Sequence, residues 1–381
     1  MIYRVAPVNL GAGTGNSWQD AMDLQAAIAS AVSGDELWLL GENNIWNVGG
    51  RYQLTATWNI NFPNLHIYGG FRGTEASLAQ RNALIACNNP AFPDYFVYPS
   101  ILEGGLNQSL QFPIISFINA NDCILDGFII EQGLHNIPGA VGSGLSVYRS
   151  NNFTMENVVL RQNLAEFGSG IYLHMVSSSA LRNCIVENNT SQSLGGGLSL
   201  ENCSNINLWN VLFFGNRLIM GASGNGSGAI YVDNSSQIIF NNITVADNFI
   251  QNVPPVGEGI YCINSNVEIY NSIFYPDDIA WFPIANIPTI DYCMLNQIIT
   301  GQNGFGIPSQ FATPPFPPPN FVNQGAPAWN YHLRTNPPFA VPSPCIDAGN
   351  ATLNPAALTT DLEGKPRVMG ADVDMGVFET P

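Results

Sequence analysis

One pattern recurs six times between Asp126 and Asp277, and it constrains the fold more than any other feature of the sequence. Each copy holds a polar residue, a mostly apolar run and, six residues after the first, a second polar residue. Successive copies begin 31, 26, 27, 32 and 29 residues apart. The six pairs are Asp126/Gln132, Asn157/Asn163, Asn183/Asn189, Asn210/Asn216, Asn242/Asn248 and Asn271/Asp277. Repeats of this length indicate a solenoid, in which each repeat packs only against its neighbours.

Glycine-rich turns recur in a second register of the same repeats. Each turn is followed by short runs of alternating apolar residues, and the turns end at Gly144, Gly170, Gly197, Gly228 and Gly259. Three such runs per repeat predict three short strands per coil, because alternation with a period of two is typical of half-buried strands. The period is too long for a hexapeptide β-helix, and the repeats lack the LxxLxL pattern of a leucine-rich repeat. The sequence therefore predicts an all-β fold, a right-handed parallel β-helix with three strands per coil.

Asparagine dominates both polar positions of the repeat, and this enrichment has a structural explanation. Stacked Asn side chains can hydrogen-bond from coil to coil, and Asn tolerates the left-handed backbone of a tight bend. Because both columns recur at a fixed spacing, we assign them to the bends that close each coil rather than to a ligand-binding array of side chains. The predicted Asn ladder comprises Asn157, Asn183, Asn210, Asn242, Asn271, Asn163, Asn189, Asn216 and Asn248.

Composition supports a long continuous core and limits the range of partners. Apolar residues make up 46% of the 381 residues and charged residues only 10%, which excludes a disordered chain. The net charge is −17, with a single lysine, so we expect no nucleic acid and no anionic membrane surface as a partner. No apolar run approaches the length of a membrane span, so we expect no membrane insertion.

The cysteines favour packing over chemistry. Seven are scattered along the chain without CxxC or Cys/His spacing, which leaves a structural zinc site without support. We interpret most of them as small buried apolar residues. A late pair, Cys293–Cys345, is left open as a disulfide.

The chain divides into three segments of one structural domain. Residues 1–50 are predicted to form an N-terminal cap, with an amphipathic helix at about 18–32 that starts after the N-cap Ser17 and covers the end of the core. Residues 51–295 form the solenoid, most regular at 118–278. Residues 296–381 form an irregular proline-rich segment and a C-terminal cap packed on the solenoid, since the five prolines in Thr313–Asn320 cannot pair as a central strand.

Several stretches resemble secreted bacterial β-helix repeat proteins. They are NSWQDA and GDELW within 16–38, IYGGFRGTE at 67–75, SPCIDAGN at 343–350 and DMGVFE at 374–379. The repeats also resemble the GGAI and FxxN elements of polymorphic outer-membrane-protein repeats, best seen in Gly228–Ile230 and Phe213–Asn216. The resemblance implies the β-helix fold and a secreted, extracellular or cell-surface location. It implies no particular activity, because the family mixes surface proteins, adhesin-like proteins and polysaccharide-active proteins.

If the function is chemical, it should lie where the rungs differ from one another. The residues four positions after each glycine turn include Tyr148, His174 and Glu201, with Arg149 and Asp233 beside this column. Neighbouring rungs lie roughly 4.8 Å apart, so His174 and Glu201 should be neighbours. We therefore name His174 and Glu201 as candidate catalytic residues, and Tyr148, Arg149 and Asp233 as candidate substrate-binding residues. The competing interpretation is an ordinary solvated sheet face.

Two further residue sets could bind ligands. The acids Asp347, Asp361, Asp372 and Asp374 could hold calcium, which prefers carboxylate and carbonyl oxygens, although fixing Arg367 and the turns of the cap is the simpler role. No other cofactor is implied. The tryptophans could stack on sugars, but solenoid cores also contain aromatic residues; for Trp209 the sequence does not decide between an inward and an outward face.

Two functional hypotheses follow. The first is a non-enzymatic, secreted or surface-displayed scaffold or adhesin-like protein that self-associates into a homo-oligomer or filament. The alternative is a polysaccharide lyase or glycoside hydrolase that acts on an extracellular carbohydrate along an exposed sheet face. An assay for new reducing ends or unsaturated products separates the two hypotheses.

Overall fold

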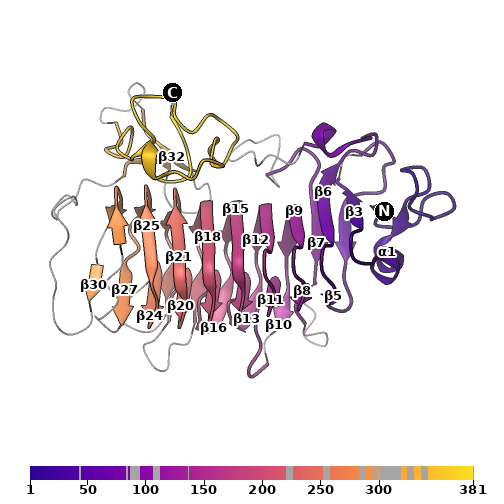
Figure 1. Ribbon diagram of the computed structural model, residues 1–381, viewed down its shortest axis with the longest axis horizontal. Helices are drawn as coiled ribbons and strands as arrows, with labels where there is room; N and C mark the ends of the chain where they lie inside the picture. Colours follow the sequence, from indigo (N-terminus) through magenta and orange to yellow (C-terminus); the bar gives the residue numbers. More distant parts are fainter. Residues whose placement is uncertain are drawn as a thin grey trace.

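The chain coils into a right-handed parallel β-solenoid of about eight turns, with three parallel sheets and one short helix (Figure 1). This architecture, seen in a computed structural model, confirms the fold predicted from the repeats. The structure describes residues 1–42, 44–82, 85, 95–105, 112–135, 137–219, 226–251, 258–282, 289–295, 298–300, 319–323, 330–335 and 342–380.

Within these residues the strands form three parallel sheets and one antiparallel pair. The large sheet contains β1 (Ile2–Ala6), β2 (Met22–Asp23), β3 (Glu36–Leu40), β4 (Arg51–Gln53), β6 (His66–Phe71), β7 (Ser100–Glu103), β9 (Ile124–Glu131), β12 (Thr154–Arg161), β15 (Ser177–Glu187), β18 (Ser204–Phe214), β21 (Ser236–Asn241), β22 (Thr244–Ala246), β25 (Val267–Tyr270), β26 (Ile273–Phe274), β28 (Thr289–Asp291) and β29 (Met294–Leu295). The nine-stranded sheet contains β5 (Trp58–Ile60), β8 (Ile115–Ile118), β11 (Leu145–Tyr148), β14 (Ile171–His174), β17 (Leu198–Glu201), β20 (Ile230–Asp233), β24 (Ile260–Ile263), β27 (Ile279–Phe282) and β30 (Ile298–Thr300). The five-stranded sheet contains β10 (Leu134–His135), β13 (Leu164–Phe167), β16 (Thr190–Leu194), β19 (Arg217–Leu218) and β23 (Phe249–Ile250). The antiparallel pair is β31 (Phe321–Asn323) and β32 (Asn330–Leu333).

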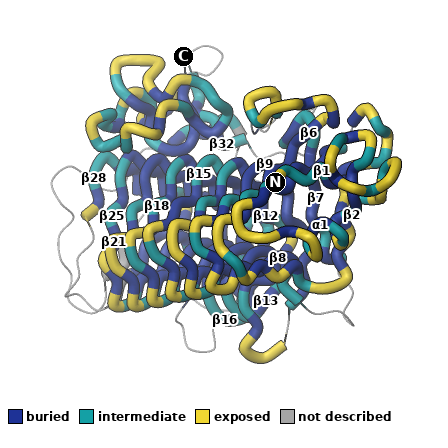
Figure 2. Tube along the Cα trace, turned by 45° about the vertical axis from the view of Figure 1, so that its right-hand side comes forward, coloured by how far each residue is buried: buried dark blue, intermediate teal, exposed yellow. Residues whose placement is uncertain are grey.

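The core runs the length of the solenoid and is built from inward-pointing residues of successive coils. Leu145, Ile171, Leu198 and Ile230 occupy one such column of the nine-stranded sheet and are fully buried. Exposed residues lie mainly at the turns between strands, whereas the strands are largely buried (Figure 2). The alternation that predicted the strands therefore also defines the core.

The first Asn column forms the bend within the large sheet. Asn157, Asn183, Asn210 and Asn271 have φ angles of 51°, 51°, 53° and 49°, and Asn242 has 53°, all in the left-handed region that Asn tolerates. The predicted role of this column is thus confirmed. The first predicted pair was wrong by one residue: Gly127 aligns with Asn157, since Glu156 pairs with Asp126 and Val158 with Phe128. Glycine adopts the same backbone, with φ at 86°, without a side-chain amide.

The second Asn column is a continuous hydrogen-bonded ladder inside the solenoid. The Nδ2 atom of Asn163 donates to Asn189 at 2.9 Å, Asn189 to Asn216 at 3.0 Å and Asn216 to Asn248 at 2.9 Å. Asn248 in turn donates to the carboxylate of Asp277 at 2.6 Å. All five side chains are buried. At the other end Gly133, not Gln132, donates its backbone N–H to Asn163, which is the second consequence of the one-residue error in the first pair.

The N-terminal helix is shorter than predicted. It spans Leu24–Ser30 (α1), and Asp23 rather than Ser17 caps it by accepting from the Ala26 N–H at 2.9 Å. The Ser17 hydroxyl instead accepts from the Asp20 N–H within a turn. Residues 22–23 form β2 and pair with β1, so strand pairing overrides the helical periodicity there. The helix lies at the N-terminal end of the solenoid and buries Leu24 and Ala27 (Figure 1).

The described C-terminal residues pack along the side of the large sheet (Figure 1). Asn210 donates to the Thr360 carbonyl at 2.7 Å, and Asn241 donates to the Leu353 carbonyl at 2.8 Å. The Gly376 N–H donates to the Asn271 carbonyl at 2.8 Å. The prediction for the proline-rich stretch falls on 313–318, which lie outside the described residues.

The cysteines are thiols where the structure describes them. Cys293 and Cys345 are free and buried, so the disulfide left open between them does not form. Cys123, Cys184, Cys203 and Cys262 are also free and buried, as expected for small packing residues. In the part of the chain that is described, no helix is long and apolar enough to cross a membrane.

Candidate functional site

The nine-stranded sheet brings the predicted site residues into one outward column. Tyr148, His174, Glu201 and Asp233 are paired in register on the adjacent strands β11, β14, β17 and β20. Their neighbours Val147, Leu173, Leu200 and Val232 are fully buried, so the period-two alternation directs the column outward. We call these four outward residues the predicted stripe.

The register confirms that His174 and Glu201 are neighbours and corrects the place of Asp233. Asp233 stands in the column itself, where the count of four residues after the glycine turn pointed to Val232. The cause is one extra turn residue: β17 begins directly after Gly197, whereas Ala229 separates Gly228 from β20. Two carboxylates therefore occupy adjacent rungs.

His174 is held in a network of aromatic and acidic side chains. Its imidazole stacks on the Tyr148 ring, with 4.8 Å between the centroids and 5° between the planes. The Tyr172 hydroxyl donates to Glu201 Oε2 at 2.9 Å and lies 3.3 Å from His174 Nδ1. His174 Nδ1 is 3.6 Å from the same Glu201 oxygen. Stacking and hydrogen bonding together fix both the position and the orientation of the imidazole.

Tyr172 is the member of this network that the sequence analysis missed. It precedes His174 by two residues on β14 and so lies on the same outward face. The same alternation that selected His174 could have identified it. Burial and the nearby Glu201 carboxylate raise the pKa of the Tyr172 phenol, which therefore stays protonated and serves as a donor.

The other end of the predicted stripe is acidic and aromatic. Burial raises the pKa of the Asp233 carboxyl, against the effect of hydrogen bonds from Asn234. Tyr231 stacks on Tyr261, with 6.1 Å between the ring centroids. Burial and the Asp233 and Glu201 carboxylates raise the pKa of Tyr231, so this phenol also remains a donor.

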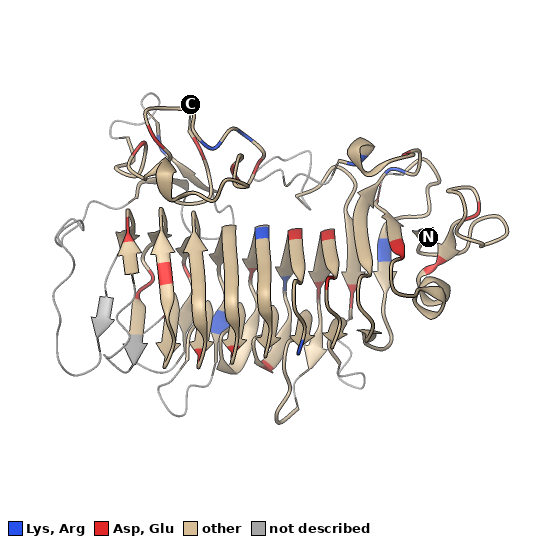
Figure 3. Ribbon diagram, in the orientation of Figure 1, with Lys and Arg blue, Asp and Glu red and all other residues tan. Residues whose placement is uncertain are grey.

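One guanidinium accompanies the predicted stripe. Arg149 is exposed at the bend after β11, and its guanidinium carbon lies 5.0 Å from the Tyr148 ring centroid. Elsewhere on the strands charged residues are sparse (Figure 3). The arrangement thus offers two acids, an imidazole, phenolic donors and one cation on a single face.

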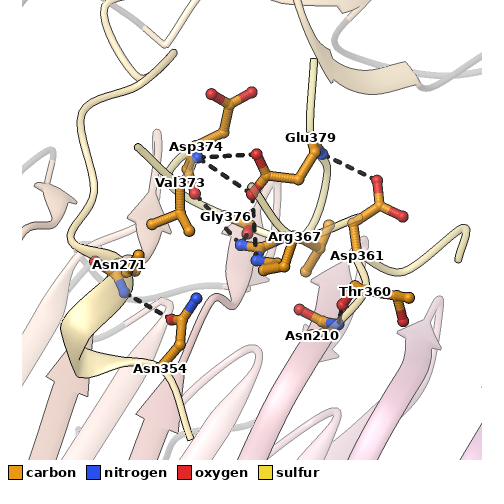
Figure 4. A network of polar contacts seen from close by, with 12 residues as sticks. Asn210, Asn271, Asn354, Thr360, Asp361, Arg367, Val373, Asp374, Gly376 and Glu379 are labelled. Atoms are coloured by element: carbon orange, nitrogen blue, oxygen red, sulfur yellow. Dashed lines mark hydrogen bonds and ion pairs between the residues drawn. The ribbon is translucent and has the colours of Figure 1, made fainter. Parts of the chain in front are cut away.

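The predicted calcium acids face backbone amides. Asp374 accepts from the Asp347 N–H at 2.7 Å and the Thr380 N–H at 2.8 Å. Asp361 accepts from the Glu379 N–H at 3.0 Å (Figure 4). Asp372 accepts from the Ala351 N–H at 2.7 Å. These bonds fix the turns of the C-terminal segment.

Arg367 lies at the centre of the same segment. Its Nε atom is 3.3 Å from Glu379 Oε1, and both side chains are almost completely buried (Figure 4). Burial raises the pKa of Glu379 to about 8, against the attraction of Arg367. Within the described ranges no group of three or more His, Cys, Asp or Glu side chains is arranged to hold a metal ion. Calcium binding by the four acids stays a prediction.

The tryptophans divide between the core and the surface. Trp58 is buried in the core, which removes it as a sugar platform. Trp209 points outward from β18, between the buried residues Leu208 and Asn210. The side chains of Trp281 and Trp329 lie outside the described residues.

Comparison with known proteins shows the fold alone. No family model matches the chain, and no curated protein matches it, so the resemblance to outer-membrane-protein repeats gains no support. Among solved structures, the pectate lyase Pel9A has a TM-score of 0.53 at 12% identity, covering 100% of this chain and 96% of that one. An alginate lyase from Paenibacillus sp. str. FPU-7 has a TM-score of 0.39 at 12% identity, covering 73% and 88%. A rhamnogalacturonan lyase has a TM-score of 0.38 at 11% identity, covering 76% and 73%.

Proposed function

We propose that this protein is a secreted, carbohydrate-active β-helix that binds a polysaccharide along the nine-stranded sheet and cleaves its glycosidic bonds. The observation that carries the proposal is the Tyr172–His174–Glu201 network with Asp233 on the next rung. The Asn columns, by contrast, form the bends and the buried ladder, so their role is structural. Extracellular polymers are the substrates to which a secreted rod with a long flat face has access.

The two carboxylates have environments that suit different roles. Adjacent rungs are roughly 4.8 Å apart, which is compatible with the close pair of carboxyl groups in a retaining glycosidase. Burial favours the protonated form of Asp233, so this residue donates its proton to the glycosidic oxygen as the bond to the anomeric carbon breaks. Glu201 attacks that carbon, and water activated by Asp233 then releases the sugar from Glu201.

The neighbouring side chains position these acids and the sugar. The Tyr172 hydroxyl holds one oxygen of Glu201, so the other oxygen is directed to the substrate. His174, stacked on Tyr148, restrains Glu201 from the adjacent rung. Arg149 and Tyr148 would bind sugar units beyond the point of cleavage.

The charge balance favours hydrolysis over elimination. Elimination acts on a uronic acid, and a polyuronate would approach two carboxylates and a single guanidinium. The pectate lyase that shares this fold acts on pectate, which shows that a solenoid of this kind can present a polysaccharide-active face. A neutral or sparsely charged chain fits the predicted stripe better.

The test is cleavage of neutral and acidic polysaccharides by the purified protein. We expect new reducing ends without the ultraviolet absorbance of unsaturated products. Glu201→Gln and Asp233→Asn should each lower the rate by at least about 100-fold, as expected for the loss of a nucleophile and of an acid–base residue. Glu268→Gln on the large sheet is the control and should leave the rate unchanged. Full activity in Glu201→Gln would refute the site. Unsaturated products would show that the reaction is elimination and not hydrolysis.

A structural role is the second candidate function. Among the described residues, β30 is the last strand of the nine-stranded sheet and pairs with β27, and a second copy of the chain pairing at this end would continue the sheet. This pairing supports end-to-end association into a homo-oligomer or filament, as a scaffold or adhesin-like protein would require. The particle mass in solution tests it: a monomer at all concentrations, together with glycan cleavage, would exclude this role.

A further inference from the structure

A pocket lies beside α1, at the N-terminal end of the solenoid (Figure 1). Its volume is about 370 Å³, within the range of about 300–1,000 Å³ that small-molecule sites occupy. Three segments wall it: residues 7–9 after β1, residues 23–25 at the start of α1, and Tyr52 and Gln53 on β4. The next strand of the same coil, β5, lies four rungs from Glu201 on β17, about 19 Å along the sheet. The pocket is therefore separate from the predicted stripe.

Hydrogen bonds tie the walls of the pocket together. The Asp23 N–H donates to Asn9 Oδ1 at 2.7 Å, which joins the start of α1 to the segment after β1. The Tyr52 hydroxyl lies 3.1 Å from the Val5 carbonyl oxygen and 3.0 Å from the Leu40 carbonyl oxygen, which joins β4 to β1 and β3. The pocket is therefore preformed, and a ligand does not have to order its walls.

Part of the lining is apolar. Leu24 and Tyr52 are buried, and Pro7 is half-buried. Val8 has 53% of its surface exposed and carries the apolar surface out to the rim. This surface suits the C–H groups of a ligand, because it offers them contact without a polar group to leave unpaired.

The polar residues of the lining keep unused hydrogen-bonding groups. Asn9 accepts through Oδ1, but its Nδ2 donates to no described residue. The exposed side chain of Gln25 makes no hydrogen bond to a described residue. Gln53 donates to the Glu103 carbonyl at 3.3 Å, and its Oε1 accepts from no described residue. Asp23 caps α1 through Oδ1, which leaves Oδ2 without a donor among the described residues.

The charge and donor content of the lining decide between ligand classes. Asp23 carries a charge, and the described lining contains no Lys or Arg, so an anion would meet a carboxylate without a balancing cation. A metal ion would find a single carboxylate here, whereas calcium takes six to eight oxygen ligands. An organic cation would offer no acceptor to the amide N–H groups. Hydroxyl groups both donate and accept, as carboxamides do, so a neutral polyol matches the lining.

We propose that the pocket binds a neutral sugar unit. The sugar hydroxyls exchange hydrogen bonds with the amides of Asn9, Gln25 and Gln53, and one hydroxyl donates to the free oxygen of Asp23. The C–H face of the ring packs on Val8 and Leu24. The choice of a sugar among neutral polyols rests on the proposed function, and the pocket gives the polymer a second point of attachment away from the cleaving residues.

Isothermal titration calorimetry in a Glu201→Gln background measures this binding without cleavage. The probes are maltotriose, cellotriose and xylotriose, with trigalacturonate as the anionic comparison. At least one neutral probe should bind at least about tenfold more tightly than trigalacturonate. Gln25→Ala and Gln53→Ala each remove hydrogen-bonding groups and should weaken that binding about fivefold. Gln19→Ala removes an exposed glutamine of the same cap outside the lining and should change nothing.

Asp23→Asn separates recognition from structure. Asn is as good an N-cap residue as Asp, so α1 keeps its cap while the charge that repels anions is removed. Trigalacturonate should then bind at least about threefold more tightly, because the lining no longer carries a like charge. A purely structural Asp23 would leave the affinity for trigalacturonate unchanged.

Three results would overturn the pocket as a neutral-sugar site. They are the absence of binding by all three neutral probes, equally tight binding of trigalacturonate, and an affinity that survives Gln25→Ala and Gln53→Ala but is lost in Tyr148→Ala. In the last case the sugar occupies the predicted stripe instead. Failure to cleave any polysaccharide would overturn the proposed function alone, since this titration requires no catalysis.

Discussion

Replacing Asn189 by alanine would break the buried ladder at its centre. The Asn189 amide makes four hydrogen bonds. Its Nδ2 atom donates to Asn216 and to the Leu160 carbonyl, each at 3.0 Å. Its Oδ1 atom accepts from the backbone N–H and the Nδ2 of Asn163, at 3.1 and 2.9 Å. The side chain is fully buried, so water cannot replace these partners.

The expected loss in the free energy of unfolding is about 4–6 kcal/mol. Three lost hydrogen bonds contribute about 1 kcal/mol each, and the Asn163 N–H, buried without an acceptor, costs about 1–3 kcal/mol. Whole domains are stable by only about 5–15 kcal/mol, so this one change would remove a large part of the stability.

Equilibrium urea unfolding measures the effect as a shift in midpoint at constant slope. The matched control is Asn207→Ala. Asn207 points outward from the neighbouring strand β18, and its side chain makes no hydrogen bond to a described residue; we expect a change within about 0.5 kcal/mol. A loss in Asn189→Ala no larger than the loss in Asn207→Ala would refute the ladder as a source of stability.

Three further predictions concern the bends, the buried acids and calcium. Asn183→Ala should be about 1–2 kcal/mol less stable than Asn183→Gly, since residue 183 has φ of 51°; equal urea midpoints would contradict this. Burial raises the pKa of Glu187 to about 7, above its unfolded value near 4.5. Its stabilising contribution is therefore present below pH 4.5 and lost as the pH rises through 7. The melting temperature should fall between pH 5 and pH 8 in the wild type and less in Glu187→Gln; parallel profiles would exclude Glu187 as the cause. Calcium should leave the melting temperature equal to that in chelator, because Asp374 and its neighbours already accept backbone N–H groups; a rise of several degrees would establish the site.

The repeat made most of the fold predictable. One error arose because two residue types with different side chains adopt the same backbone conformation. Asn and Gly both adopt left-handed φ, so the first bend falls on Gly127 although the polar pattern suggested Asp126. The helix was predicted too long because residues 22–23 pair with β1, a tertiary contact that local periodicity does not report. Register within the solenoid was otherwise set by the alternation of buried and outward residues.

The site was predictable as a column but not as a network. Counting from the glycine turns placed His174 beside Glu201, yet the extra residue Ala229 shifted Asp233 into line. Arg81 could not be assigned to Asp126 from sequence, since it arrives from a loop 45 residues earlier in the chain. Contacts of this kind depend on where a loop folds, and no periodic pattern encodes that.

The buried ladder has a direction. Every amide donates toward the C-terminal coils, and the last member, Asp277, accepts from the backbone N–H and the Nδ2 of Asn248 but has no amide hydrogen to pass on. A duplicated coil inserted before Asp277 would find a donor on one side and an acceptor on the other. Repeat duplication can therefore lengthen the ladder at any rung before Asp277, whereas the solenoid itself continues beyond this residue in β27 to β30.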